Sequence, residues 1–105
     1  MPENKTHTYR FGEKVAIDNV EFLNSELEPY FTSVKVKNVI FDLENVYTCD
    51  LYGVNFFLQS QRSAEKNKIK LVLYRPSSLL KDILKDAGLL HIFTIMDTLE
   101  EALIN

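Results

Sequence analysis

The sequence predicts one small α/β domain over residues 1–105, with a mostly parallel or mixed sheet of four to five strands and four helices packed against it. Three apolar runs, at residues 39–43, 69–74 and 92–96, are short, nearly continuous and rich in β-branched and aromatic types. Such runs are typical of strands covered on both faces. Helical patterns separate the runs, and this alternation favours right-handed crossovers and a parallel sheet. A chain of 105 residues, 46% of them hydrophobic, can form one core.

The N-terminal part begins with weak patterns. Residues 1–7 are polar and are expected to form a flexible N-terminus. Two strands are expected next, at Thr8–Phe11 and Val15–Ile17, on either side of Gly12. The first strand is expected to run either parallel or antiparallel to the remaining sheet.

A first helix is predicted near residues 19–33. Asp18 and Glu21 have the spacing of a capping box at its start, and Pro29 predicts a kink or an early end. The residues that would supply its apolar face are Phe22, Leu23, Leu27, Tyr30 and Phe31.

The longest predicted helix runs from Asp50 to Asn67. Asp50 is the expected N-cap, and Gly53 is expected at the surface in the first turn. Lys66 lies near the end, where a cation suits the helix dipole. The residues at helical spacing on one stripe are Val54, Phe57, Leu58 and Gln61.

Two shorter helices are predicted after it. One covers residues 76–87, with Ser77 or Ser78 as cap and Gly88 as the C-terminal left-handed residue. The last begins at Asp97, with Leu99, Ala102 and Leu103 facing inward. The stripe expected on helix 76–87 consists of Leu79, Leu80, Ile83, Leu84 and Ala87. The residues expected in the core are Phe41, Leu43, Leu71, Leu73, Ile83 and Leu84.

Composition excludes several classes of function. With 15 acidic and 12 basic residues, the net charge of −3 disfavours a nucleic-acid binder. Cys49 is the single cysteine, and His7 and His91 are isolated, so no disulfide, metal or cofactor is expected. The polar N-terminus lacks the apolar core of a signal peptide, and no apolar run is long enough to insert in a membrane. The expected location is the cytoplasm.

Few residues suggest catalysis, and no enzyme activity is predicted. The glycines at 12, 53 and 88 never cluster as a phosphate loop requires. A Cys49–His91 dyad is compatible with the composition, but a lone cysteine at a strand end is more often a small buried hydrophobe. Asp42 and Asp50 could pair as acid and base, yet aspartates at such places usually cap or solvate backbone.

The segment Asn45–Val54 is the most informative part of the chain. It joins a buried strand to a helix and therefore lies at the carboxyl end of a strand, where open α/β sheets bind their ligands. A helix N-terminus offers free N–H groups to an anion or an acidic partner residue. The structural alternative is a plain turn, with Asp50 as N-cap and Gly53 placed for close packing.

The segments around this turn resemble the STAS family, which includes the bacterial anti-sigma factor antagonists. The family pattern is an apolar strand ending in Asp-Leu, a short loop, and Asp-Ser-Ser-Gly opening a helix; the matching residues are Val39–Val46 and Asp50–Gly53. Lys70–Leu73 and Ser77–Leu89 are similar to the next strand and a helix ending in Ala-Gly-Leu. Ile92–Leu103 looks like the closing strand, Asp and Glu-Ala-Leu helix.

This resemblance, over about residues 36–104, implies a regulatory function. In the antagonists the second serine of Asp-Ser-Ser-Gly is phosphorylated by a cognate anti-sigma factor that is also a kinase, and the unphosphorylated antagonist binds that kinase. Here Leu51 and Tyr52 occupy the two serine positions, so the usual switch is expected to be lost. A kinase built for a short hydroxyl does not readily reach a phenol, and Thr48 is the nearest other hydroxyl.

The resemblance therefore implies a protein-binding module, monomeric or weakly dimeric, that docks an anti-sigma factor kinase or a similar regulator. The alternative is a STAS subunit of a transporter, or a STAS protein that binds a small ligand such as a nucleotide or lipid. Tyr52 stands at the phosphorylation-site position. The expected partner-binding residues are Asp50, Leu51, Tyr52, Gly53, Val54, Asn55 and Leu58.

Overall fold

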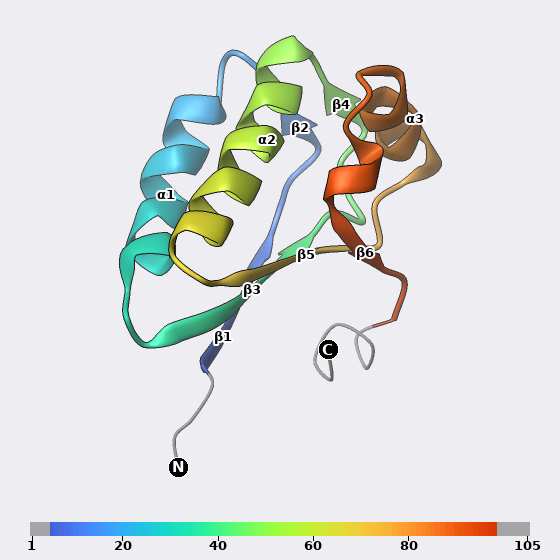
Figure 1. The fold of residues 1–105 in the computed structure, drawn as a ribbon. Helices are drawn as coiled ribbons and strands as arrows, with labels where there is room; N and C mark the ends of the chain where they lie inside the picture. Colours follow the sequence, from blue (N-terminus) through green and yellow to red (C-terminus); the bar gives the residue numbers. More distant parts are fainter. Residues whose placement is uncertain (1–4, 99–105) are drawn as a thin grey trace.

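A computed structural model describes residues 5–98 (Figure 1). A four-stranded parallel sheet in the order β1-β3-β5-β6 carries the fold, and a separate two-stranded parallel pair is formed by β2 and β4. The strands are β1 (Lys5–Arg10), β2 (Lys14–Val15), β3 (Val36–Asp42), β4 (Thr48–Cys49), β5 (Lys70–Tyr74) and β6 (Thr94–Met96). The helices are α1 (Val20–Thr32), α2 (Leu51–Lys66), α3 (Ser78–Asp86) and the 3₁₀ turn η1 (Leu90–Ile92).

The order of the strands determines where the core lies. Each strand of the main sheet lies beside the next one along the chain, and Figure 1 shows α1 and α2 side by side over one face. Phe41 and Leu73 of that face belong to the same apolar cluster as side chains of all three helices. Ile40 and Val72 point to the opposite face and are also buried. The central strands are thus covered on both faces, as their continuous apolar sequence predicts.

The sheet differs from the prediction at its first strand and its last. β1 pairs parallel to β3, so the antiparallel alternative is wrong, and β1 begins at Lys5, three residues before the predicted start. β2 pairs with β4 instead of adding a fifth strand to the main sheet. The predicted strand 92–96 is only three residues long, because η1 turns the chain first and Phe93 N–H bonds to the Leu90 carbonyl at 3.3 Å.

The start and the end of α1 also differ from the prediction. Its N-cap is Asn19, one residue after the predicted Asp18, and it has no side-chain cap bond because Asn19 Oδ1 accepts a bond from Ala16 N–H instead. Asp18 forms an ion pair with Lys14. The helix continues past Pro29 to Thr32, so the predicted early end is wrong; Pro29 has no N–H and leaves only the carbonyl four residues earlier without its helical bond. Phe22, expected on the apolar face, is 60% exposed.

The predicted start and end of α3 are confirmed. Ser77 caps the helix by accepting a bond from Leu80 N–H at 3.2 Å, and Gly88 follows with a φ of +76°. Leu80 and Leu84 are buried, Ile83 is half-buried, and Leu79 is exposed, contrary to its predicted place on the stripe. Three α-helices lie within residues 5–98; the helix predicted from Asp97 onward falls largely on residues outside that range. The other predicted core residues, Phe41, Leu43, Leu71 and Leu73, are buried.

Candidate functional site

The N-terminus of α2 is held by one carboxylate, as the sequence predicts. Asp50 accepts a hydrogen bond from Gly53 N–H on Oδ1 at 2.9 Å, which caps the helix. Its other oxygen, Oδ2, accepts a bond from Ile17 N–H at 3.0 Å. The bond from Gly53 is the main reason why the pKa of Asp50 is lowered, and the bond from Ile17 adds to it. Asp50 thereby joins the turn after β2 to the start of α2.

Gly53 is buried in this first turn, which corrects the prediction that it lies at the surface. A Cβ at this position would be 2.1 Å from the Val15 carbonyl oxygen and 2.7 Å from Cys49 Sγ. The glycine is therefore required because the backbones of α2 and β2 approach too closely for a side chain. This is the close-packing role that the structural alternative gave it.

The β2–β4 pair connects two segments that are far apart in the sequence. Lys14 pairs with Thr48 and Val15 with Cys49. The Glu13 carbonyl accepts bonds from both Tyr47 N–H at 2.8 Å and Thr48 N–H at 3.0 Å. Residues 13–17 and 47–53 therefore form one structural unit at the start of α2.

Cys49 is part of this unit as a packing residue. Its side chain is half-buried, and its thiol lies 3.6 Å from the Asp50 carbonyl oxygen that accepts its hydrogen bond. Burial, with a smaller contribution from the Asp50 charge, raises the pKa of the thiol to about 11. The thiol is therefore protonated at neutral pH and is a poor nucleophile. This supports the interpretation of Cys49 as a small buried hydrophobe.

Four large apolar side chains of this unit are exposed to solvent. Leu51 is 81% exposed, Tyr47 60%, Ile17 59% and Tyr52 55%. We call these four residues the apolar face. Leu51 and Tyr52 were expected at the site, whereas sequence reasoning missed Ile17 and Tyr47. Ile17 was assigned to a strand, and only the contact between residues 13–17 and 47–53 brings it to the site.

The other predicted partner-binding residues differ in accessibility. Asn55 is exposed, and its side-chain oxygen accepts a bond from Gln59 at 3.4 Å. Leu58 is half-buried. Val54 is only 7% exposed and belongs to the core. Gly53 packs directly against the backbone of β2. Val54 and Gly53 are therefore unavailable to a partner, because their side of the helix packs on the domain itself.

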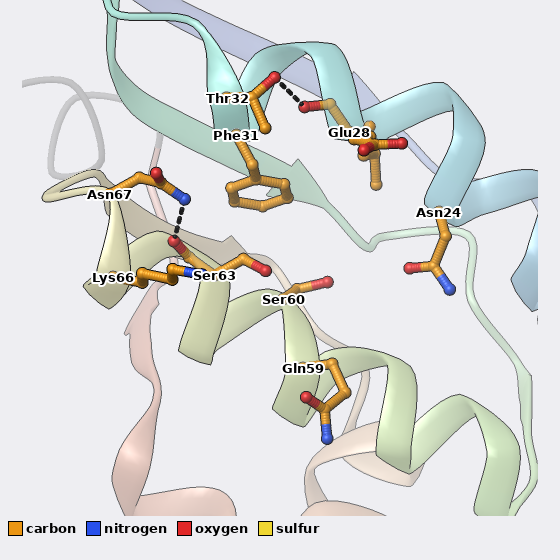
Figure 2. Close-up of a pocket in the computed structure, with 10 residues that line it drawn as sticks. Asn24, Glu28, Phe31, Thr32, Gln59, Ser60, Ser63, Lys66 and Asn67 are labelled. Atoms are coloured by element: carbon orange, nitrogen blue, oxygen red, sulfur yellow. Dashed lines mark hydrogen bonds between the residues drawn. The ribbon is translucent and has the colours of Figure 1, made fainter.

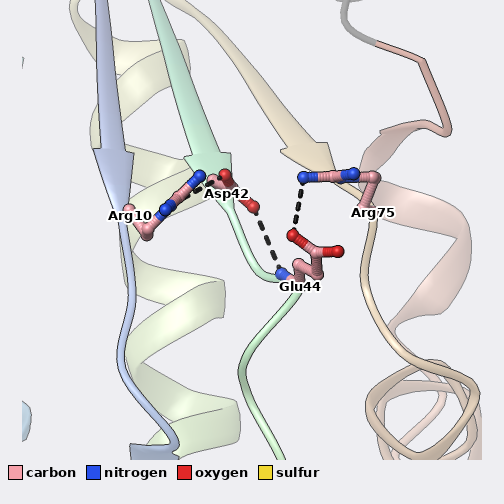
Figure 3. Close-up of polar contacts among 4 residues, drawn as sticks. All are labelled: Arg10, Asp42, Glu44 and Arg75. Carbon is pink, nitrogen blue, oxygen red and sulfur yellow. Dashed lines mark hydrogen bonds and ion pairs between the residues drawn. The ribbon is translucent and has the colours of Figure 1, made fainter.

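Asp42, the alternative acid–base partner of Asp50, is engaged elsewhere. Figure 3 shows it at the end of β3, where Oδ2 lies 3.4 Å from Arg10 Nε and Oδ1 accepts a bond from Glu44 N–H. Glu44 in turn bonds Arg75 at 2.7 Å. These contacts join the carboxyl ends of β1, β3 and β5, so Asp42 has a structural role. The two aspartates point to different partners and do not form a dyad.

Among residues 5–98, no group of three or more His, Cys, Asp or Glu side chains could hold a metal ion. Within the same range, no helix is both long enough and apolar enough to cross a membrane.

Comparisons with known proteins agree on the fold. The anti-sigma factor antagonist SpoIIAA in its unphosphorylated form is 23% identical with a TM-score of 0.77, over 98% of this chain and 89% of that chain. A putative anti-sigma factor antagonist from Thermotoga maritima is 17% identical with a TM-score of 0.82, over 94% and 85% of the two chains. A sulfate transporter family protein from Wolinella succinogenes is 20% identical with a TM-score of 0.80, over 94% and 82%.

The sequence comparisons add the family. A search of curated proteins finds no match. The family model of the STAS domain, however, matches residues 1–102, nearly the whole chain. This match fits the order of strands and helices and the capped turn at Asp50 described above. The chain belongs to the STAS domain family.

Proposed function

We propose that this domain is a regulatory module that binds a kinase-type anti-sigma factor, or a similar regulator, through the apolar face. The observation that carries the proposal is the exposure of Ile17, Tyr47, Leu51 and Tyr52 on two segments held together by hydrogen bonds. Exposed large apolar side chains are unfavourable in water, and patches of them commonly mark protein-binding surfaces. Tyrosines, moreover, are enriched among the residues that dominate binding energy.

The charges around the apolar face define the chemistry of the partner. Glu13 and Glu21 are exposed in the neighbouring segments, and the nearby Lys14 is neutralised by its ion pair with Asp18. Asp50 has both oxygens occupied by backbone N–H groups. A complementary partner would therefore offer an apolar pocket with a basic rim, and the rim would mainly speed association.

The proposal excludes the family's serine switch. Leu51 and Tyr52 replace the two serines, so the hydroxyl of residue 52 lies at the far end of an aromatic ring. Incubation with an anti-sigma kinase and ATP should leave residue 52 without phosphate, as read by mass spectrometry of the intact protein and its peptides. Phosphate on Tyr52 in protein purified from its host would contradict this part of the proposal, and phosphate on the exposed Thr48 would move the switch to β4.

The Tyr52→Asp substitution tests the docking surface. It removes an exposed ring and adds a charge, so affinity for the purified partner should fall by about thirtyfold or more, the loss typical of a dominant interface residue. The partner is first isolated by pull-down from the host and identified as a histidine-kinase-like ATPase or another regulator. Isothermal titration calorimetry then measures the affinity.

Leu79→Asp is the matched control. Leu79 is 49% exposed and is the second residue of α3, as Tyr52 is the second residue of α2. The control adds the same charge at an equivalent helical position that is not one of the four residues of the apolar face, and it should leave affinity unchanged. Equal affinities of the Tyr52→Asp protein and the unsubstituted protein would place the interface elsewhere.

The second candidate is a STAS subunit that serves a transporter. Its specific support is the likeness in fold to the Wolinella sulfate transporter family protein. The same pull-down separates the two candidates, since membrane transport components in place of a kinase would favour the second. A transporter partner that is insensitive to Tyr52→Asp would reject the first.

A further inference from the structure

A groove between α1 and α2 lies away from the apolar face, at the ends of these helices close to Thr32 and Lys66 (Figure 2). It measures about 360 Å³, within the usual range of small-molecule sites. Two helices that pack over a sheet normally fill the seam between them with large apolar side chains. Here α2 contributes two serines, Ser60 and Ser63, and Figure 2 shows both hydroxyls directed into the groove.

Ser60 is the unusual residue of this groove. It is only 5% exposed, yet its hydroxyl has no hydrogen-bond partner among the residues that the structure describes. Polar side chains in helices often bond a backbone carbonyl four residues earlier. Thr32 and Asn67, on the same groove, do so through the carbonyls of Glu28 and Ser63, at 3.0 and 2.8 Å. The Ser60 hydroxyl forms no such bond and opens into the groove, so it is free to bond a ligand that lies there.

The banks of the groove carry opposite charges. Glu28 lies on α1 and Lys66 on α2, both are exposed, and neither forms an ion pair within residues 5–98. Leu27 and Phe31 form an apolar floor and are buried in the core. The lining thus offers one anion, one cation and free hydroxyls above an apolar surface.

This arrangement disfavours ligands that carry several negative charges. Among the lining residues that the structure describes, Lys66 is the single cation, and it lies in the last turn of α2, where the negative end of the helix dipole already attracts it. A polyphosphate would therefore face Glu28 and a helix C-terminus with one lysine to balance it. A ligand with one amine and one carboxylate fits both banks.

We propose that this groove binds a small zwitterion of amino-acid size. Its amine would meet Glu28, its carboxylate would meet Lys66 and Ser63, and its polar atoms would supply the hydrogen bond that Ser60 lacks. The apolar part of the ligand would lie on Leu27 and Phe31. This site is independent of the apolar face and of the partner proposed for it.

The test is a titration of the full chain with a panel of free L-amino acids, in which heteronuclear NMR measures the changes in the backbone amide signals. At least one member should give saturable shifts at Phe31, Ser60 and Ser63, and its amide-capped, uncharged derivative should not. Ser60→Ala and Lys66→Gln should each weaken binding by about tenfold, the effect of one lost polar contact. Lys85→Gln, in the last turn of α3, is the matched control and should bind normally.

Two results would overturn the proposal. Either no amino acid gives saturable shifts, or binding is equal in Ser60→Ala, Lys66→Gln and the unsubstituted protein. Thermal unfolding of the ligand-free Ser60→Ala protein gives a separate check. Its midpoint should be unchanged or higher, because no hydrogen bond is lost; a lower midpoint means that the hydroxyl already serves the fold.

Discussion

The first turns of α2 and α3 are built in the same way but present different surfaces. Asp50 and Ser77 each cap a helix by accepting a bond from the N–H three residues later, at 2.9 and 3.2 Å. Ser77 also donates to the Val46 carbonyl at 3.2 Å, which fixes α3 against the loop after β3. Asp50 instead uses its second oxygen to hold Ile17.

The difference lies in what each cap brings together. At the start of α2, the bond from Ile17 to Asp50 holds the segment after β2 against the helix. The exposed side chains of Ile17, Leu51 and Tyr52 therefore lie on two segments that are bonded to each other. At the start of α3, Leu79 is exposed, whereas the next residue, Leu80, is 1% exposed and anchors the helix in the core. A cap determines where a helix begins, and the neighbouring segments determine whether that beginning can bind a partner.

The largest effect is expected from Gly53→Ala, which breaks the contact that distinguishes α2. The added Cβ would meet the Val15 backbone oxygen at 2.1 Å, and backbone cannot move aside as a flexible side chain can. We expect a loss of about 3 kcal/mol or more in the free energy of unfolding, the upper range for overpacking. Chemical denaturation measures it. Gly12→Ala, with nothing within 4 Å of its Cβ, should be close to neutral; similar losses in both variants would contradict this role of Gly53.

The next effect concerns the anchor of α3. Leu80→Ala removes a buried side chain and should cost about 2–5 kcal/mol in the free energy of unfolding. Its neighbour Leu79 is 49% exposed, so Leu79→Ala should change stability by less than about 0.5 kcal/mol. Denaturation curves of the two variants provide the comparison. If Leu79→Ala is as costly as Leu80→Ala, Leu79 is not a surface residue and cannot serve as the control for Tyr52.

Features fixed by nearby residues could be predicted from the sequence. The caps at Asp50 and Ser77 and the left-handed Gly88 depend on contacts within one turn, and the structure contains all three. The buried strands β3 and β5 follow from their apolar runs, because a strand that is covered on both faces needs apolar residues at every position.

Features fixed by distant residues could not be predicted. Gly53 was expected at the surface because its own turn does not show that β2, almost 40 residues earlier, packs against it. The pair of two-residue strands β2 and β4 is too short to have a periodic pattern. For the same reason Ile17 was assigned to a strand rather than to the site. The capping box predicted at Asp18 did not form, because the helix begins one residue later with Asn19 as its N-cap and Asp18 pairs with Lys14.

The smallest effect is a pH dependence that separates the two caps, since Asp50 titrates and the Ser77 hydroxyl does not. Hydrogen bonds from Gly53 and Ile17 hold the pKa of Asp50 in the folded protein below its ordinary value of 3.8, so the unfolded chain takes up the proton first. The stabilisation is therefore complete above the ordinary value and is lost as the pH falls from there through the lower folded pKa. Hydrogen exchange should show declining protection at Gly53 over this window and steady protection at Leu80. In the Asp50→Asn protein, which keeps a cap oxygen but cannot ionise, the decline at Gly53 should vanish. A decline that persists in that variant would mean that another carboxylate governs the start of α2.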